Sequence, residues 1–515
     1  MLLAKLVNKR PSPLPIIVVT GASGFIGRHF VNNFCNEFYM YCIGRRSQRA
    51  AAVTEHENIC WIRQDIAEEA GVKKIFSKIA KNGGADFVLH LAGYYDFDNE
   101  EHPEFERTNI NGTKYILDNT GQLNIKRFIY TSSLTVSEFT KPGTILNEKS
   151  PADATFPYAI SKRICEEMIL EYSYLFPSSI IRLAAIFSDW CEYGPLYMFL
   201  TGWFSNSWKA RILAGKGESA VPYLHVSDVN RFINLLIKQS TLLPDYQIYV
   251  VSPDGCSTHK ELYSLAMRYN FTNQAKPFFI PKGLAAIVVL IKDVFGKLIG
   301  KRPFERPWMI KYINQKMVID ASLTRKMLSW KPTGRYHINR RLLFLIENMK
   351  SNPYEWNRRN YEAIYKKGEG RPNLAILDAM LLLEEEIITK ILMELTSKKY
   401  KQIFKTYQSL QPQKLKERIE VIYEILKRAI RSGDRMHIMP YANNLAIERI
   451  KENFEVQEVI QAIIKIGNVI VFNLLKHPPL QSLQPRIHDE INLTIQLIAD
   501  EVEDTYERLT GFSAG

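Results

Sequence analysis

The feature that most constrains the fold is a glycine-rich stretch at residues 20–27, TGASGFIG, which directly follows a short apolar run, Ile16–Thr20. Glycine allows a tight turn at Gly21, a close approach of backbone to phosphate at Gly24, and tight packing of the next helix at Gly27. A helix that begins here offers free backbone N–H groups and the positive end of its dipole. The pattern therefore predicts a strand–turn–helix unit that binds a pyrophosphate. The residues expected at the ligand are Gly21, Ser23, Gly24, Phe25, Ile26 and Gly27.

Apolar runs and helical patterns alternate through the first third of the chain. After Ile16–Thr20, the expected strands are Tyr39–Gly44, Ile59–Arg63, Asp86–Ala92, Arg127–Ser133 and Ser178–Ala184. Helical spacing lies between most of them, at Phe25–Glu37, Glu104–Gly121 and Tyr158–Phe176. This alternation predicts an α/β fold, a doubly wound parallel sheet covered on both faces. Residues 185–310 are less regular and rich in proline, glycine and aromatics, so we expect a small substrate-binding lobe there.

The pattern changes near residue 355. After a polar stretch, the chain shows apolar residues at a spacing of three and four. The expected helices are Ile376–Thr396, Pro412–Ser432, Met439–Phe454, Val456–Leu475 and Arg486–Leu509. We therefore expect a Rossmann-type domain with its lobe over 1–354, a linker over 355–374, and a separate all-α helical bundle over 375–515.

Charge and cysteine content narrow the classes of partner and compartment. The net charge is +13, but residues 355–515 hold 23 basic and 23 acidic residues, so the whole excess precedes them. No basic tail marks a nucleic-acid binder. The six cysteines are scattered without CxxC spacing, and no Cys/His cluster predicts a metal site. A reducing, cytoplasmic compartment follows, with a small molecule as the expected ligand.

The most apolar stretch, Leu284–Ile291 (LAAIVVLI), leaves two interpretations open. It is far shorter than the roughly 20 residues that cross a bilayer. Lys292, Lys297, Lys301 and Arg302 follow it. We favour a lid helix over an apolar pocket. The second interpretation is a helix that lies on an anionic membrane surface over 284–302, which would make the protein a peripheral membrane protein.

Two arginines follow the second expected strand. Enzymes that prefer NAD usually carry an acidic residue here for the ribose hydroxyls, whereas Arg45 and Arg46 stand at this place. Arginine suits a 2′-phosphate by charge and by bidentate geometry. NADP is therefore the expected cofactor. NAD remains the alternative, with both arginines solvated.

Tyr158 and Lys162 lie one helical turn apart, so both side chains can face one ligand. A nearby ammonium favours the phenolate and is expected to lower the pKa of Tyr158 from about 10. The fifth expected strand ends in Thr131-Ser132-Ser133, at the strand end that faces the ligand crevice of a parallel sheet. Together these residues predict an acid–base site beside a bound dinucleotide.

With these motifs in place, residues 14–350 resemble an extended short-chain dehydrogenase/reductase of the NAD(P)-dependent epimerase/dehydratase group. The matching segments, in chain order, are 20–27, Asp65-Ile66, Leu91-Ala92-Gly93, 108–113 (TNINGT), Thr131-Ser132-Ser133, Tyr158–Lys162, Ile181-Arg182-Leu183, 223–229 (YLHVSDV), Asp320-Ala321-Ser322 and Leu328–Pro332.

The resemblance implies a role for each matching residue. Tyr158 would be the general acid/base, Lys162 would hold the nicotinamide ribose, Ser133 would polarise the substrate oxygen, and Asn109 would support the site. The resemblance also implies a cofactor site lined by Asp65 and Ile66 at the adenine, with Leu91, Ala92, Gly93, Thr131, Tyr158 and Lys162 further along it. The implied reaction is hydride transfer between nicotinamide and a carbonyl or alcohol carbon.

Aromatic residues point to one branch of this family. The segment 94–97 (YYDF) and the aromatics of the expected lobe favour an apolar substrate, closer to the 3β-hydroxysteroid dehydrogenase-like branch than to the sugar epimerases. The Asp-Glu pair of the family's dehydratases is absent after Thr131, where Ser132 and Ser133 stand. A sugar-nucleotide epimerase with tightly held NAD is the enzymatic alternative.

Residues 375–515 weakly resemble the helical sensor domain of bacterial stressosome co-antagonist proteins, on 441–446 (YANNLA), 458–462 (EVIQA) and 500–504 (DEVED). This resemblance implies a bacterial protein that binds a protein partner or self-associates through its bundle. Helix pairing in the dehydrogenase superfamily also implies a homo-oligomer. A third interpretation follows, a regulator that senses nicotinamide redox state and signals through the bundle.

Overall fold

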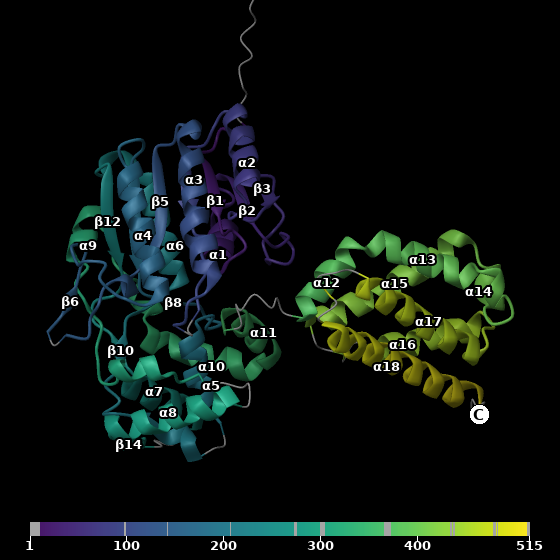
Figure 1. Ribbon diagram of the computed structural model, residues 1–515. Coiled ribbons are helices and arrows are strands. Elements are labelled where there is room, and N and C mark those ends of the chain that lie inside the picture. Colours follow the sequence, from purple (N-terminus) through teal and green to yellow (C-terminus); the bar gives the residue numbers. More distant parts are fainter. Residues whose placement is uncertain are drawn as a thin grey trace, which may run out of the picture. The chain divides into compact units, whose positions relative to one another are not determined.

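The computed structural model describes residues 11–511 except 97–98, 142, 206–207, 272–275, 299–303, 365–371, 433–434, 436–437, 477–479 and 481–482. The chain forms two compact units, residues 1–364 and 365–515 (Figure 1). Residues 355–364, which we expected in a linker, belong to helix α11 (Pro353–Ile364) of the first unit. The reason is packing, because Trp356 is 2% exposed in an apolar cluster of that unit.

A seven-stranded sheet of parallel pairs is the centre of unit 1. Its order is β12-β7-β5-β4-β1-β2-β3. The strands are β1 (Ile16–Thr20), β2 (Tyr39–Gly44), β3 (Ile59–Arg63), β4 (Phe87–His90), β5 (Arg127–Ser133), β7 (Ser178–Leu183) and β12 (Tyr246–Val251). The direction in which strands are added reverses between β1 and β4. Ligands of open parallel sheets bind outside the strand ends at such a point.

Alternation along each strand explains why helices cover both faces. In β1, Ile17 and Val19 face one core, with α1 (Phe25–Phe34) and α6 (Val226–Lys238). Ile16 and Val18 face the other, with α2 (Glu69–Lys81), α3 (Gly112–Thr120) and α4 (Pro157–Tyr172). A strand that is apolar on both sides is the signature of a doubly covered sheet. The expected fold class is confirmed.

A lobe stands beyond the carboxyl ends of the strands and has its own apolar cluster. Its helices are α5 (Gly194–Trp203), α7 (His259–Phe271), α8 (Lys282–Leu298), α10 (Ile338–Ser351) and α11. The short strands β9 (Ile212–Ala214) and β14 (Phe278–Ile280) pair in parallel. The lobe thus extends past the expected 185–310, because α10 and α11 return to complete its core.

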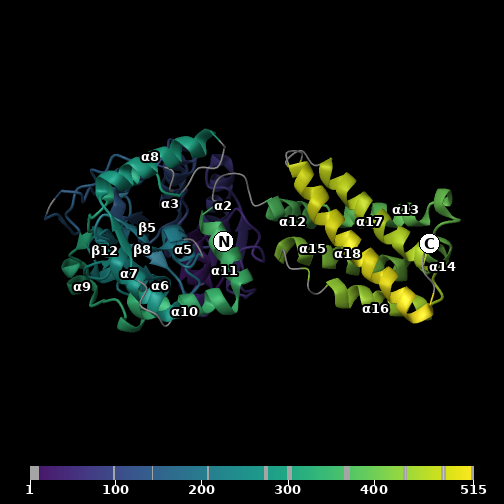
Figure 2. The ribbon, with the colours of Figure 1, turned by 90° about the horizontal axis from the view of Figure 1, so that it is seen from below.

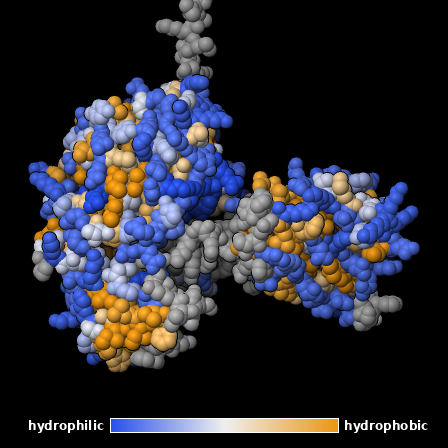
Figure 3. Space-filling model, in the orientation of Figure 1, coloured by the Kyte–Doolittle hydropathy of each residue, from blue (hydrophilic) through white to orange (hydrophobic). Residues whose placement is uncertain are grey.

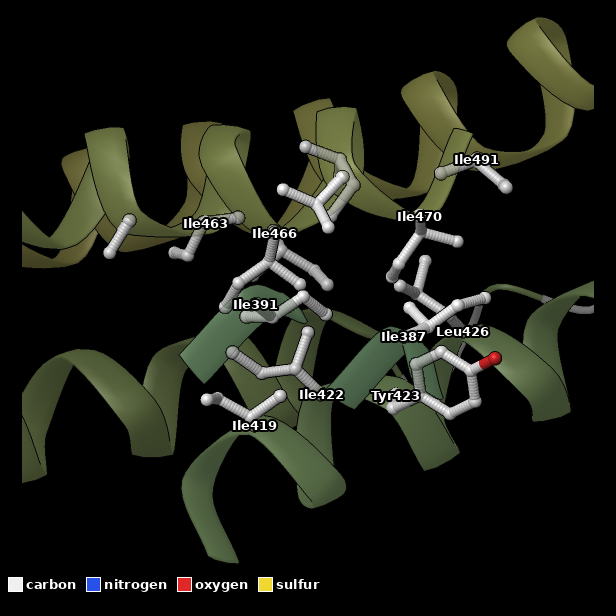
Figure 4. Packing of buried hydrophobic residues seen from close by; sticks show 14 of the residues in the cluster. Ile387, Ile391, Ile419, Ile422, Tyr423, Leu426, Ile463, Ile466, Ile470 and Ile491 are labelled. Carbon is white, nitrogen blue, oxygen red and sulfur yellow. The ribbon is translucent and has the colours of Figure 1, made fainter. Parts of the chain in front are cut away.

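Unit 2 is a helical bundle. Its helices are α12 (Pro372–Leu382), α13 (Glu384–Thr396), α14 (Lys405–Ser409), α15 (Pro412–Ser432), α16 (Ile438–Lys451), α17 (Val456–Leu475) and α18 (Gln484–Thr510). Branched aliphatic side chains of α13, α15 and α17 interdigitate in its core (Figure 4). Among the described residues, α17 is the helix that is long and apolar enough to cross a membrane, and 56% of its most apolar window is buried in this core. That burial fits a core helix.

The expected helix over 376–396 is interrupted at Leu383. Three glutamates, Glu384 to Glu386, open α13, where acidic side chains favour a helix N-terminus. Both carboxylate oxygens of Glu384 accept hydrogen bonds of 2.8 Å from Lys427 of α15. The break therefore places a charge pair between two helices that apolar periodicity alone does not reveal.

Candidate active site

The glycine turn joins β1 to α1 in the predicted way. Gly21 has a φ of +67°, and a Cβ there would lie 2.6 Å from the backbone nitrogen of Ala92, just after β4. A Cβ at Gly27 would lie 2.3 Å from the carbonyl oxygen of Gly21. Gly24 caps α1, whose first turn holds no acidic side chain. Because glycine has no side chain to bind the first N–H groups of α1, these groups face the crevice, which fits a pyrophosphate.

The two arginines after β2 point in different directions. Arg46 donates from Nη2 to the carbonyl oxygen of Ser23, so its guanidinium borders the glycine turn. The Arg45 guanidinium lies 3.9 Å from Glu104 and its side chain is 62% exposed. Both therefore flank the crevice at the end of β2, and Arg46 is the one that touches the turn.

The residues expected at the adenine, Asp65 and Ile66, follow β3, the neighbour of β2 in the sheet. Asp65 accepts a hydrogen bond of 2.6 Å from Arg107 and one of 3.0 Å from the backbone of Ala67. Ile66 is buried beneath α3, where a Cβ on Gly112 would lie 2.8 Å from its Cδ1. Sequence reasoning missed Arg107, which ties Asp65 to the π-helix η1 (Phe105–Asn111).

The strand ends on the other side of the crevice carry the proposed acid–base group. Tyr158 opens α4, and Ser133 ends β5. The Ser133 hydroxyl lies 2.8 Å from that of Thr135 and accepts from its backbone at 3.2 Å. Thr135, two residues beyond the strand, was not predicted, because Leu134 interrupts the run of hydroxyl residues. Ser133 also bonds the Tyr158 hydroxyl and works to lower its pKa.

The expected net lowering of the Tyr158 pKa is not found. Burial, ahead of the nearby Cys165 thiol, raises the pKa of Tyr158 above its usual value. Lys162 is 5% exposed, donates from Nζ to the carbonyl oxygen of Thr131 at 2.9 Å, and lies 5.9 Å from the centre of the Tyr158 ring. Desolvation therefore outweighs the ammonium charge. Tyr158 is a neutral phenol at neutral pH.

Asn109 is a positioning residue. Its Oδ1 accepts from the backbone of Tyr94 at 2.6 Å, and its Nδ2 donates to the Tyr94 carbonyl at 3.0 Å and to Ser161 of α4 at 2.9 Å. A Cβ on Gly93 would lie 3.4 Å from both the Asn109 oxygen and Lys162 Nζ. Asn109 thus ties Tyr94, which follows Leu91 to Gly93 after β4, to Ser161 of α4. We expected an ordinary helix here; η1 has the wider π turn, which frequently marks functional sites.

A cavity of about 910 Å³ opens between this edge of the sheet and the lobe. Tyr158 lines it, with Tyr95 edge-on to its ring at 4.7 Å. Further walls come from α5 and α8, including Phe199, Trp203, Leu284 and Val288. The expected lid interpretation of 284–291 is thereby supported. Phe97 of the aromatic segment lies outside the described residues.

Polar groups are sparse in this cavity. Of the described lining residues, the arginine and lysine are Arg306 and Lys292, and each has an acidic neighbour, Asp293 at 3.8 Å and Glu305 at 3.9 Å. Across the described parts of the chain, no group of three or more His, Cys, Asp or Glu side chains is placed to hold a metal ion. The Tyr158 hydroxyl therefore lies beside a mostly apolar space, which Asp96, His259 and Glu305 also line.

A model of the NAD dependent epimerase/dehydratase family matches residues 17–252. The dTDP-D-glucose 4,6-dehydratase of Dictyostelium discoideum is 26% identical over 275 residues, which cover 47% of this chain and 59% of that protein. The 3 beta-hydroxysteroid dehydrogenase type 7 of Rattus norvegicus is 22% identical over 359 residues, which cover 66% of this chain and 98% of that protein. The chain spans between 50% and 59% of the length of the four dTDP-D-glucose 4,6-dehydratases that it matches.

Solved structures share the fold of unit 1. UDP-glucose 4-epimerase of Thermotoga maritima, with UDP-glucose, superimposes with a TM-score of 0.50 at 19% identity, covering 66% of this chain and 99% of its own. dTDP-glucose 4,6-dehydratase of Bacillus anthracis, with NAD, gives 0.51 at 16% identity, covering 67% and 99%. At these identities the likeness concerns the fold.

Proposed function

We propose that the protein is an NADP-dependent oxidoreductase of the extended short-chain dehydrogenase type, acting on an apolar carbonyl or alcohol. The match of residues 17–252 to the NAD dependent epimerase/dehydratase family model supports this. The observation that carries the proposal is the apolar cavity with Tyr158 in its wall. Ser133 and Lys162 lie beside that tyrosine, and the glycine turn lies across the same strand edge.

The protonation state of Tyr158 suits reduction of a carbonyl. A neutral phenol donates its proton to the oxygen as negative charge develops there, and Ser133 donates a second hydrogen bond to the same oxygen. When bound, the reduced nicotinamide supplies the hydride that adds to the carbonyl carbon. The Lys162 ammonium, fixed by Thr131, is placed to bind a ribose hydroxyl and to favour the phenolate left behind.

The arginines after β2 support NADP over NAD. A 2′-phosphate on the adenosine ribose would meet Arg46 at the glycine turn, with Arg45 on the outer side. One of the solved structures named above contains NAD, so NAD is the alternative cofactor. Gly24 and the first turn of α1 would hold the pyrophosphate in either case.

The lining of the cavity argues for an apolar substrate. A sugar nucleotide brings a diphosphate and many hydroxyls, which need cations and hydrogen-bond partners. The two cationic residues in the described lining, Arg306 and Lys292, already face Asp293 and Glu305. The rat steroid dehydrogenase matches over 98% of its length, which fits the same choice of substrate class.

The test is NADPH oxidation by full-length protein with two substrate panels. One contains hydrophobic ketones and aldehydes, the other UDP- and dTDP-sugars. Turnover of the first panel alone, lost in Tyr158→Phe, supports the proposal. Sugar interconversion without added cofactor would establish the epimerase alternative instead. Binding of NADPH with no turnover of either panel would leave a redox sensor.

We extend the proposal to the bundle, as a surface for self-association or for a protein partner. Ile464 and Phe472 of α17 and Leu493 of α18 are large apolar side chains that are exposed to solvent. Phe472→Glu is expected to lower the sedimentation mass of the protein; an unchanged mass would argue against self-association there. The resemblance to a bacterial sensor domain stays a prediction. All six cysteines are free thiols, which supports a cytoplasmic site of action.

A further inference from the structure

Helix α8 has two apolar faces, and only one of them covers the cavity. Ala285, Val288 and Val289 line the cavity. Ile287, Leu290, Ile291, Val294 and Phe295 do not line it, and each is between 48% and 63% exposed. Their spacing of three and four residues places them in one stripe along the helix. A stripe of this kind serves no purpose in the core of unit 1.

The stripe is part of a larger apolar surface. Phe278 and Phe279 of the neighbouring β14 are 61% and 44% exposed. Figure 3 shows apolar residues gathered over the α8 and β14 end of unit 1, and Figure 2 shows α8 running along the rim of that unit. Exposed patches of this size mark interaction sites. We call this surface, made of the α8 stripe and the two phenylalanines, the α8 face.

The charge around the α8 face is positive. Residues 276–298 contain four lysines and a single acidic residue, Asp293. Of the four, Lys292 has the exposed Glu305 at 3.9 Å. Asp293 is 3% exposed and faces Arg306, so its charge does not reach the surface. Lys276 and Lys282 are exposed at the ends of the face. An apolar stripe flanked by lysines is complementary to an anionic lipid surface, and α8 is too short to cross a bilayer, so it would lie in the interface plane.

The α8 face is continuous with the cavity. Leu284 and Val288 line the cavity and are also 50% and 38% exposed. An apolar molecule that leaves the acyl region of a bilayer would therefore meet apolar side chains all the way to Tyr158. This path avoids the cost of passing an apolar substrate through water.

We propose that the α8 face docks unit 1 on an anionic lipid bilayer, and that the substrate enters the cavity directly from that bilayer. The inference rests on the proposed function for the identity of the reaction, but the docking itself does not require catalysis. The lid and the membrane contact are then two functions of the same helix, α8. Lys301 and Arg302, which belong to the second interpretation, lie outside the described residues.

The test is flotation of full-length protein with two kinds of vesicle, pure phosphatidylcholine and an equal mixture of phosphatidylcholine and phosphatidylglycerol. Wild type is expected to float with the mixed vesicles and less with the neutral ones. The double variant Ile291→Gln, Phe295→Gln should lower the partition coefficient by about tenfold or more, because two large apolar side chains no longer enter the interface. Lys276→Gln with Lys282→Gln should lower it by about tenfold on anionic vesicles alone.

A matched control changes exposed leucines at the amino-terminal ends of the strands. Leu175 precedes β7 and Leu242 precedes β12, and both are exposed. Leu175→Gln with Leu242→Gln should leave flotation unchanged. Thermal unfolding with NADPH verifies that every variant is folded, and turnover of a short, water-soluble ketone tests the proposed function separately from docking.

Three results would overturn the proposal. One is a folded wild type that floats with neither vesicle. Another is a double variant of the α8 face that floats as well as wild type. The last is a wild type that self-associates without binding vesicles and becomes monomeric in the double variant, which would make the face an interface between two copies of the chain.

Discussion

Buried polar side chains have different roles in the two units. In unit 1, Lys162 and Asn109 are buried at the carboxyl edge of the sheet, where each holds backbone or hydroxyl groups around an open cavity. In unit 2, Lys427 and Glu458 are buried between helices, where Lys427 pairs with Glu384 and Glu458 accepts from the first N–H groups of α14. Buried polarity therefore shapes a reaction site in one unit and fixes helix ends and pairing in the other.

This contrast can be measured in one molecule, because all seven tryptophans precede residue 365. Tryptophan fluorescence follows unit 1, whereas far-ultraviolet circular dichroism also follows the helices of unit 2. A change in one unit should thus move one signal and leave the other transition in place.

Loss of the phenol of Tyr158 should give the largest effect. Tyr158→Phe removes the proton donor, so turnover is expected to fall by about 10²–10⁴-fold with unchanged NADPH affinity. The matched control is Tyr423→Phe in the bundle, which removes a buried hydrogen bond of 2.8 Å to the Met380 carbonyl. It should lower the stability of unit 2 by about 1 kcal/mol and leave turnover intact. Equal turnover in both variants would contradict the assigned role of Tyr158.

Alanine at the glycine turn should rank second. Gly21→Ala meets both a left-handed backbone and the backbone of Ala92, neither of which can yield. We expect a loss of about 2–4 kcal/mol in the fluorescence transition, together with weaker cofactor binding. In the bundle, a Cβ on Gly467 would lie 2.7 Å from Ile495 Cγ1, a side chain that can move.

Gly467→Ala should therefore cost far less than Gly21→Ala, since alanine also favours the helix by about 1 kcal/mol. Circular dichroism of the unit 2 transition measures it. If Gly467→Ala proved the more costly of the two, the turn would not be the tightly constrained element that its geometry indicates.

The choice of cofactor gives a smaller effect. Arg46→Ala should weaken NADPH binding by about tenfold or more relative to NADH, because a charge-assisted hydrogen bond to the 2′-phosphate is lost. Arg49→Ala, an exposed neighbour, is the control for general charge. Titration calorimetry with both nucleotides gives the ratio. Parallel losses for the two would mean that Arg46 supports the turn through Ser23 without reading the phosphate.

Acid should weaken unit 1 before unit 2. Burial lowers the pKa of His29 and His90 to about 3 and that of His259 to about 4, from 6.5. Folding then favours the neutral rings, so their stabilisation is complete above pH 6.5 and is lost as pH falls towards the folded values. Each histidine costs about 1.4 kcal/mol per pH unit below 6.5.

The fluorescence midpoint should therefore drop between pH 7 and pH 5, while the unit 2 transition moves little, because His488, the histidine among the described residues of unit 2, is not fully buried. His90→Gln should flatten this dependence. A common shift of both transitions would show that the two units unfold together.

Most strands of unit 1 could be read from the sequence because each is apolar on both faces and ends at a turn. β1, β2, β3 and β5 have the expected bounds. β12 (Tyr246–Val251) was missed because Tyr246 and Gln247 make its first half look amphipathic, although the helical spacing of α6 precedes it. The candidate site residues followed from motifs, whereas Arg107 owes its place to a contact between distant elements and Thr135 to the turn after β5.

The pKa of Tyr158 shows what spacing cannot supply. The i, i+4 relation with Lys162 gives direction along a helix, but not the depth of burial or the acceptor that already holds the ammonium. Here the Thr131 carbonyl accepts the hydrogen bond from the Lys162 ammonium, and burial raises the pKa of Tyr158.

The π turn of η1 accommodates one extra residue in the helix. A π turn holds one residue more than the α-helix that continues from it at Gly112. Deleting one residue between Phe105 and Thr108 would relax η1 to an α-helix and rotate the preceding side chains by about 100° relative to α4. Inserting one residue here would rotate the side chains before the π turn while α3 keeps its packing. A reverse deletion would convert a site-bearing helix back to a plain structural one while keeping Asn109 and its contacts downstream.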